Sequence, residues 1–229
     1  MQIENILRKH KNSIHPVFKP ELNNENTLIM DFSNSNTELR NIDVDNTALI
    51  NEYIFNIIKS SNCLYGYGGY LEDRDVYKRS PLFADGDQHR TIHLGVDVWT
   101  PADTPFYFPL DGKIHSFNNN ETYGDYGPTI ITEHVLDDTK FYLLFGHLSM
   151  VSIKNLKPGQ PIKGGEQGGK VGKPEENGNW PPHLHFQVIS NLMDKKGDFP
   201  GTASPGNFDE FKAICHDPDV FFNLNCARS

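Results

Sequence analysis

Apolar and polar residues alternate along residues 184–189, LHFQVI, which are also rich in aromatic and β-branched side chains. This pattern predicts a β-strand, and it places the start after Pro182, because proline cannot donate to a sheet ladder. Successive side chains of a strand point to opposite faces. One face therefore suits a core and carries Leu184, Phe186 and Val188. The opposite face carries His183, His185 and Gln187.

The two histidines of that polar face lie roughly 7 Å apart at Cα, since each residue of a strand advances about 3.3 Å. Two interpretations are open for them. The polar face of the strand is exposed to solvent, or one imidazole holds a metal while the other reaches a molecule bound to it.

Four more short segments after residue 100 are rich in β-forming residues and are separated by turn signals. They are Thr104 to Phe108, Lys113 to Phe117, Thr129 to His134 and Phe141 to Phe145. Asp111-Gly112 is typical of a tight hairpin, and Asp137-Asp138-Thr139 is expected to join two strands. The spacing predicts a mainly β fold, either a sandwich or a partly open barrel.

Residues 1–62 follow a different pattern. Apolar residues recur at helical spacing between Leu49 and Ile58, with Asp45, Asn46 or Thr47 available as the N-cap, so one amphipathic helix is expected there. Residues 28–32, LIMDF, are a short strand candidate. This segment is too small for an independent domain. We expect an N-terminal α/β extension, residues 1–62, packed on a main domain of residues 63–229.

The composition narrows the range of partners. The 229 residues include 21 Lys and Arg against 30 Asp and Glu, a net charge of −9, which argues against binding nucleic acid or an anionic membrane surface. The chain has no run of about 18 apolar residues, and its first residues lack the apolar core of a signal peptide, so we expect a cytoplasmic protein. The three cysteines form no CxxC pair, and a bond between Cys215 and Cys226 stays open.

Three segments carry the residue types of a catalytic metal site: HxxxD at 93–97, GHLS at 146–149 and HxH at 183–185. In a straight strand His93 and Asp97 would lie about 13 Å apart, too far to share a metal, but Gly95 allows the chain to bend. Gly146 could likewise aim His147 into a site. A catalytic zinc takes three protein ligands and keeps one open position, and two histidines with one aspartate satisfy this. The remaining histidines could act as acid, base or oxyanion donor.

HxxxD followed by HxH, with TPADTPFYFPLDGKI and GHLS between them, resembles the M23 (lysostaphin or LytM type) zinc peptidases over residues 93–189. The resemblance implies an antiparallel β-sheet groove related to barrel-sandwich hybrids. It also implies one zinc held by His93, Asp97 and His185, with His147 and His183 as the unligated catalytic pair. GYGGYLEDRDVY, DYGPTIITEH, ENGNWPPHLHFQ, GDFPG and CHDPDVFF resemble the M23-like module that is fused to class III aminotransferases.

The resemblance implies a zinc-dependent hydrolase that cleaves peptide bonds, with a peptide or peptidoglycan-derived substrate. Two alternatives stay open: a non-catalytic module that binds zinc or a ligand, and a metal-dependent amidase acting on small amine metabolites. Arg74, Arg79 and Arg90 precede the metal motif and are either surface charges or ligands of a substrate carboxylate. The other six histidines are expected to be structural or on the surface. They are His10, His15, His89, His115, His134 and His216.

Overall fold

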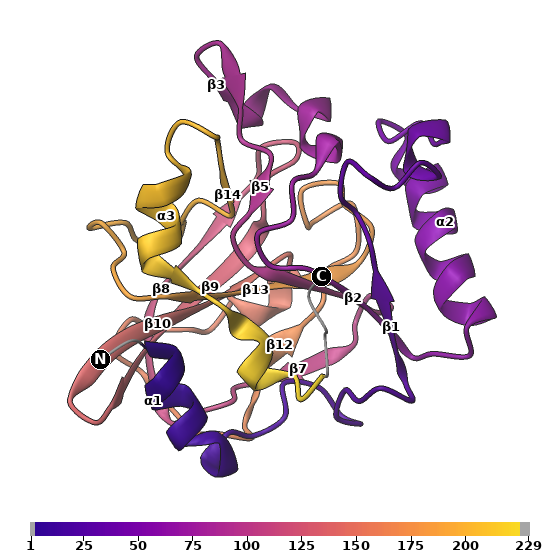
Figure 1. The fold of residues 1–229 in the computed structure, drawn as a ribbon. Coiled ribbons are helices and arrows are strands. Elements are labelled where there is room, and N and C mark those ends of the chain that lie inside the picture. The colour runs from indigo at the N-terminus through magenta and orange to yellow at the C-terminus, as the bar shows by residue number, and fades with distance from the viewer. Residues whose placement is uncertain (1–2, 225–229) are drawn as a thin grey trace.

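A computed structural model describes residues 3–224 and shows a mainly β fold built on one large mixed sheet (Figure 1). Within the described residues this sheet has nine strands, in the order β1-β2-β6-β13-β10-β9-β8-β11, with β15 paired to β13. Their bounds are β1 Thr27–Met30, β2 Tyr65–Gly68, β6 Val96–Trp99, β8 Gly112–Asn120, β9 Gly127–Leu136, β10 Thr139–Gly146, β11 Pro161–Ile162, β13 His183–Ile189 and β15 Cys215–His216.

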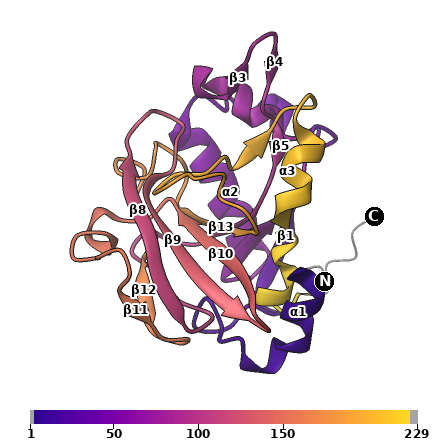
Figure 2. The same cartoon turned by 90° about the vertical axis from the view of Figure 1, so that its left-hand side faces the viewer.

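Small two-stranded sheets and helices surround the large sheet. The pairs are β3 (Ala84–Asp85) with β4 (Gln88–His89), β5 (Ile92–His93) with β14 (Thr202–Ala203), and β7 (Pro105–Tyr107) with β12 (Gln167–Lys170). The α-helices are α1 Ile3–Lys9, α2 Thr47–Ser60 and α3 Phe208–Ile214. Short 3-10 helices span Lys11–Ser13, Leu39–Asn41, Asp75–Arg79, Pro81–Phe83, Met150–Ser152 and Pro218–Phe221. Figure 2 shows β8, β9 and β10 side by side in front, with α2 behind them.

All five predicted strands of the main domain are present, and the Asp137-Asp138 turn joins β9 to β10 as expected. Both aspartates have positive φ, 46° and 58°, which is the requirement of the type I′ turn that fits a twisted hairpin. The predicted hairpin at Asp111-Gly112 is wrong, because β7 pairs with β12 whereas β8 pairs with β9. The Asp111 carboxylate instead accepts hydrogen bonds from Lys163 Nζ and Gly164 N, and so ties down a distant loop.

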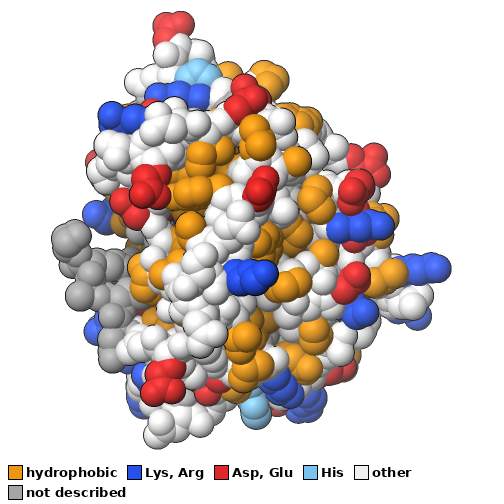
Figure 3. Space-filling model, turned by 90° about the vertical axis from the view of Figure 1, so that its right-hand side faces the viewer, with side chains coloured by type: hydrophobic (Ala, Val, Ile, Leu, Met, Phe, Trp, Pro, Cys, Tyr) orange, Lys and Arg blue, Asp and Glu red, His pale blue; other side chains and the backbone are white. Residues whose placement is uncertain are grey.

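The N-terminal segment joins the main sheet through β1, which pairs in parallel with β2. Helix α2 forms where the apolar periodicity predicts it, and Asn46 is its N-cap, accepting from the backbone N–H groups of Ala48 and Leu49. One stripe of α2, with Ile50, Ile54 and Ile58, is buried. That stripe packs the extension onto the main domain, while the division at residue 62 stays a prediction. Figure 3 views this side of the molecule and shows hydrophobic side chains gathered on it, with acidic ones scattered among them.

Strand β13 is central in the sheet and is buried along its whole length. Its apolar face belongs to the main core, as predicted. The interpretation of its other face as solvent-exposed is wrong: His183, His185 and Gln187 are 5%, 3% and 0% exposed. Polar groups buried in this way need partners, so this face of β13 requires a structural or functional explanation. Among residues 3–224, no helix is both long and apolar enough to cross a membrane.

Candidate metal centre

Three strands bring His93, Asp97 and His185 together. In the β6–β13 ladder Asp97 lies directly opposite His185, and His93 ends β5, just before the chain turns at Leu94-Gly95. The predicted bend at Gly95 is therefore present. Gly95 has a second role, because a Cβ at this position would lie 2.6 Å from the carbonyl oxygen of Phe186 and 2.9 Å from the His185 ring. Only glycine leaves room for that imidazole.

The distances among the three side chains match a metal site. His93 Nε2 lies 3.0 Å from His185 Nδ1, and Asp97 Oδ1 lies 3.3 Å and 3.2 Å from these two nitrogens. A tetrahedral zinc with bonds of about 2.0–2.1 Å separates its ligands by roughly 3.3 Å. The spacing of the three donor atoms thus fits three ligands of one such zinc.

Hydrogen bonds assign the tautomers of both imidazoles. His93 Nδ1 lies 3.0 Å from the carbonyl oxygen of Gly69, and His185 Nε2 lies 3.0 Å from Gln187 Oε1, so these nitrogens carry the protons. The Gln187 amide is oriented by its own donation to the carbonyl oxygen of Pro200 and to Cys215 Sγ. Two nitrogen lone pairs and a carboxylate oxygen therefore converge without a proton between them, a donor set that suits a divalent cation.

The charge states of His93 and Asp97 agree with this role. Burial lowers the pKa of His93 to about 4, and the nearby Arg74 acts in the same direction, so the imidazole is neutral at pH 7 and can donate a lone pair. Burial opposes the ionisation of Asp97, but His93 and Arg74 outweigh it and hold the pKa of that carboxyl well below its usual range. A neutral imidazole and an ionised carboxylate are the forms that bind zinc.

Arg74 is part of this centre, and the interpretation of it as a surface charge is wrong. Its side chain is 2% exposed. Nη1 donates to Asp97 Oδ2 over 2.5 Å and to the Tyr77 hydroxyl over 3.1 Å, and Nε donates to Glu72 Oε2 over 2.6 Å. Arg90 lies nearby, over the Phe83 ring at 5.6 Å, and donates to the carbonyl oxygen of Leu82. The Arg79 side chain lies outside the described part of the structure.

His147 and His183 lie against each other beside the three donor atoms, with ring centroids 4.1 Å apart. Each Nδ1 donates to a backbone carbonyl, that of Asn177 over 2.8 Å for His147 and that of Pro181 over 2.7 Å for His183. Nε2 therefore keeps the lone pair in both rings. Burial lowers the pKa of both imidazoles, so both are neutral proton acceptors at pH 7. His183 Nε2 lies 3.7 Å from Asp97 Oδ1, which aims it at the centre.

The predicted change of direction at Gly146 occurs one residue later. His147 itself has a positive φ of 59°, a left-handed conformation that costs a non-glycine residue about 1–2 kcal/mol. Gly146 is required for space, because a Cβ there would lie 2.6 Å from the Tyr126 ring. Backbone strain of this kind clusters at active sites and ligand-binding sites.

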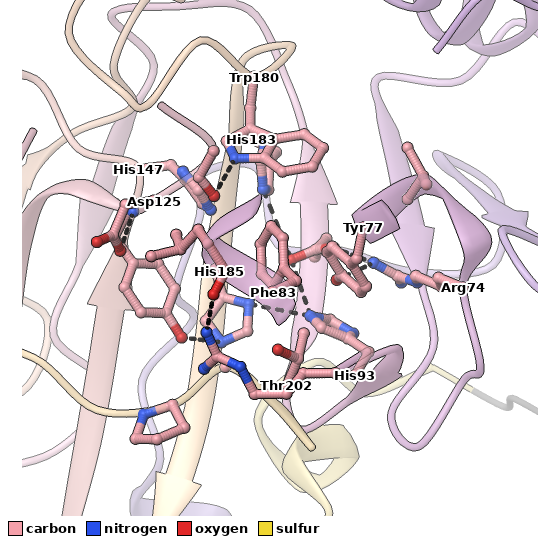
Figure 4. A pocket seen from close by; sticks show the side chains of 18 of the residues that line it. Arg74, Tyr77, Phe83, His93, Asp125, His147, Trp180, His183, His185 and Thr202 are labelled. Atoms are coloured by element: carbon pink, nitrogen blue, oxygen red, sulfur yellow. Dashed lines mark hydrogen bonds and ion pairs between the residues drawn. The ribbon is translucent and has the colours of Figure 1, made fainter. Parts of the chain in front are cut away.

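These residues line one cavity of about 190 Å³ (Figure 4). Tyr126, which the sequence analysis did not single out, also lines it, with its hydroxyl 3.4 Å from His185 Nε2. In Figure 4 Tyr77 and Arg74 lie on one side of the imidazoles and Asp125 on the other. Burial raises the pKa of the Asp125 carboxyl to about 6. Asp125 and Tyr126 begin the DYGPTIITEH motif, but the sequence does not mark either as a site residue, because each becomes notable only through its neighbours in space.

The six remaining histidines are absent from the cavity lining among the described residues, in agreement with the structural or surface role expected of them. His134 is the buried one: its Nδ1 lies 2.9 Å from the carbonyl oxygen of Asp111 and its Nε2 lies 2.7 Å from Thr132 Oγ1. Cys215 is a buried free thiol behind Gln187. Its suggested partner Cys226 lies outside the described residues.

The residues of this centre lie in a segment that matches a known protein family. Peptidase family M23 matches residues 91–196, a segment that contains His93, Asp97, His147, His183 and His185. Solved structures with similarity to this chain include a zinc-containing peptidase from Vibrio cholerae, with 28% identity over 43% of this chain and 27% of that one, and a TM-score of 0.35. The catalytic domain of lysostaphin from Staphylococcus simulans has 26% identity over 52% of this chain and 80% of that one, with a TM-score of 0.36.

A curated protein, alanine–tRNA ligase of Haemophilus influenzae (strain 86-028NP), is 31% identical over 97 residues, which are 42% of this chain and 10% of the ligase. The chain thus spans about a tenth of that relative and about a quarter of the Vibrio peptidase. The part shared with the ligase is too small a share of that protein to bring its activity to this chain.

Proposed function

We propose that this chain, whose residues 91–196 match peptidase family M23, is a zinc-dependent hydrolase that cleaves peptide bonds, with His93, Asp97 and His185 as the metal ligands. The observation that carries the proposal is that the unprotonated nitrogens of His93 and His185 and one carboxylate oxygen of Asp97 lie 3.0–3.3 Å apart among buried residues. A bound zinc would polarise the scissile carbonyl and make hydroxide available near neutral pH.

His147 and His183 are the proton carriers of this proposal. Both rings are neutral, and both are fixed by an Nδ1–H bond to a backbone carbonyl, so Nε2 is the atom that accepts and returns a proton. Each can take the proton of the attacking water and deliver it to the leaving amine. Once protonated, the same Nε2–H can stabilise the negative charge that develops on the carbonyl oxygen.

Arg74 and Tyr126 support these groups without a role as acid or base. Arg74 fixes one oxygen of Asp97, and the other oxygen then has a defined direction toward the imidazoles. Burial raises the pKa of the Tyr126 hydroxyl well above its usual range, so it keeps its proton and can donate a hydrogen bond to an oxyanion or to a substrate carbonyl. Burial of the whole set strengthens these interactions because the local dielectric constant is low.

The proposed substrates are peptides, including those derived from peptidoglycan. Purified protein is incubated with short peptides, peptidoglycan fragments and N-acyl amines, and products are followed by mass spectrometry before and after removal of metal with a chelator. The proposal expects peptide cleavage that stops on chelation and returns with zinc. Cleavage that survives full removal of metal would contradict it, and cleavage of N-acyl amines alone would make the chain an amidase.

We propose the cytoplasm as the place of action, supported by the net charge of −9, which disfavours attachment to anionic envelope polymers. Fractionation of native cells with an antibody to the chain tests this. Recovery from the medium, or from an envelope compartment, would contradict it.

A further inference from the structure

The apolar side of the cavity is built largely by residues that lie outside the family segment 91–196. We call it the apolar subsite and define it by six lining residues, of which all but the last precede residue 91. They are Phe32, Ile50, Ile54, Tyr77, Phe83 and Trp180. Phe32 follows β1, and the two isoleucines lie on the buried stripe of α2, so the N-terminal extension supplies half of the subsite.

Aromatic contacts connect the apolar subsite to the metal centre without a gap. Tyr77 lies 4.9 Å from Phe83 and 6.0 Å from Trp180, measured between ring centroids. Tyr77 also lies 6.2 Å from the ring of His93, and Trp180 lies 6.4 Å from the ring of His147. A group bound against these rings is therefore a neighbour of any bond held at the metal centre, as Figure 4 shows for the labelled rings.

The size and chemistry of the cavity define what fits. The whole cavity, metal centre included, has a volume of about 190 Å³, which exceeds the ~150 Å³ of a known apolar protein cavity that takes up benzene, so one aromatic ring or branched aliphatic side chain fits within it. A polar side chain would lose its hydration against Phe32, Ile50 and Ile54 without gaining hydrogen bonds. Glycine has no side chain and would gain nothing from the aromatic wall.

We propose that the apolar subsite binds a large apolar side chain, aromatic or branched aliphatic, on a residue that adjoins the scissile bond. This inference rests on the proposed peptidase function and specifies its substrate. It gives the N-terminal extension a role in substrate selection, since Ile50 and Ile54 of α2 form part of the wall.

The first test compares the zinc-loaded chain on matched peptides that carry Gly, Ala, Leu or Phe on either side of one cleaved bond. A misfit of about one methylene in a hydrophobic pocket changes kcat/KM by roughly 10- to 200-fold. We expect Leu or Phe peptides to exceed the Gly peptide by at least about tenfold on one side of the bond. Equal rates, or a preference for Gly, would overturn the inference while leaving the peptidase function in place.

A pair of variants tests whether α2 sets this preference. Ile54→Ala enlarges the subsite, and Ile58→Ala is its matched control: both residues are buried in one stripe of one helix, but only Ile54 lines the cavity. We expect Ile54→Ala to shift the Phe-to-Leu ratio of kcat/KM by about tenfold toward the larger side chain, and Ile58→Ala to leave the ratio unchanged. The same ratio in both variants would overturn the role of α2. Ile50→Val, a smaller change at the same wall, replaces Ile54→Ala should that variant not fold.

A binding experiment separates this inference from the proposed catalysis. The chain has two tryptophans, Trp99 and Trp180, and both line the cavity, so intrinsic fluorescence reports what enters it. Titration with N-acetylphenylalanine amide should give a saturable change that N-acetylglycine amide does not. If no peptide is cleaved but this difference is found, the apolar subsite stands and the peptidase proposal fails. If neither probe changes the fluorescence, the subsite is contradicted.

Discussion

Arg74 Nη1 donates to Oδ2 of Asp97 over 2.5 Å, so that Oδ1 of the same carboxylate is the oxygen that faces His93 and His185. The guanidinium is 2% exposed and is itself held by Glu72 and Tyr77. A candidate metal ligand is thus fixed by a buried cation, and loss of that cation would leave the buried Asp97 carboxylate without its charged partner. Partners of this kind orient metal ligands and tune their affinity.

Replacement of this cation should weaken metal binding. Arg74→Gln removes the charge that orients Asp97, and we expect the zinc dissociation constant to rise about 10- to 100-fold, measured by competition with a chromogenic chelator. The free energy of unfolding should fall by about 3–5 kcal/mol, because one partner of a buried ion pair is lost. Arg90→Gln, a change at a half-buried arginine of the same cavity, is the control and should keep zinc affinity. Unchanged affinity in Arg74→Gln would contradict the positioning role.

A larger residue at Gly95 should also weaken zinc binding, because it would crowd the His185 ring. A Cβ there would lie 2.6 Å from the carbonyl oxygen of Phe186 and 2.9 Å from the His185 ring, so Gly95→Ala should displace that imidazole. Overpacking of this kind costs about 1–3 kcal/mol, and we expect zinc affinity to fall by a comparable free energy. Gly69→Ala is the control, because its Cβ would meet nothing nearer than 3.9 Å. Equal zinc affinity in the two variants would count against the account.

Strain at His147 can be measured as a difference between two variants. The backbone φ of His147 is 59°, which glycine adopts without penalty and alanine does not. His147→Gly should therefore be more stable to unfolding than His147→Ala by about 1 kcal/mol, although both should lack hydrolytic activity. Urea unfolding of both proteins measures the difference. An alanine variant of equal or greater stability would show that the position is not strained.

Local sequence signals account for the meeting of the three candidate metal ligands. Alternation along β13 and the bend at Gly95 predict which side chains share a face, and the structure brings His93, Asp97 and His185 together as a result. Both signals are local, because they depend on backbone periodicity and on one glycine. The family resemblance supplied the division of roles between ligands and catalytic histidines, which the variants below test.

Long-range contacts account for what the sequence did not predict. Arg74 looks like any charged residue in its segment, and its burial depends on Glu72, Asp97 and Tyr77 meeting in space. The hairpin at Asp111-Gly112 failed for a similar reason: the local turn signal is present, but the pairing of β7 with β12 decides the topology. The parallel β1–β2 pair and the contribution of α2 to the cavity likewise depend on tertiary packing.

His134 should make stability depend on pH. Burial lowers its pKa to about 4 in the folded chain, against 6.5 for an unperturbed imidazole. The unfolded chain therefore binds this proton first as pH falls, so stability is highest above pH ~6.5 and declines toward pH ~4. At 1.36 kcal/mol per pH unit this residue accounts for roughly 2 kcal/mol between pH 7 and pH 5. Urea unfolding at both pH values should show a loss smaller by that amount in His134→Gln, and equal losses would contradict the assignment.

The central claim is that His185 holds the metal while His183, two residues away on the same strand face, does not. His185→Ala removes one of three protein ligands and should lose the metal, whereas His183→Ala should retain most of it and lose turnover by about 10²- to 10³-fold. The most direct measurement is zinc per chain, by elemental analysis of protein purified without chelators. The account predicts about one zinc in the wild type and in His183→Ala, and almost none in His185→Ala. A wild type without zinc, or a zinc-loaded His185→Ala beside a zinc-free His183→Ala, would contradict it.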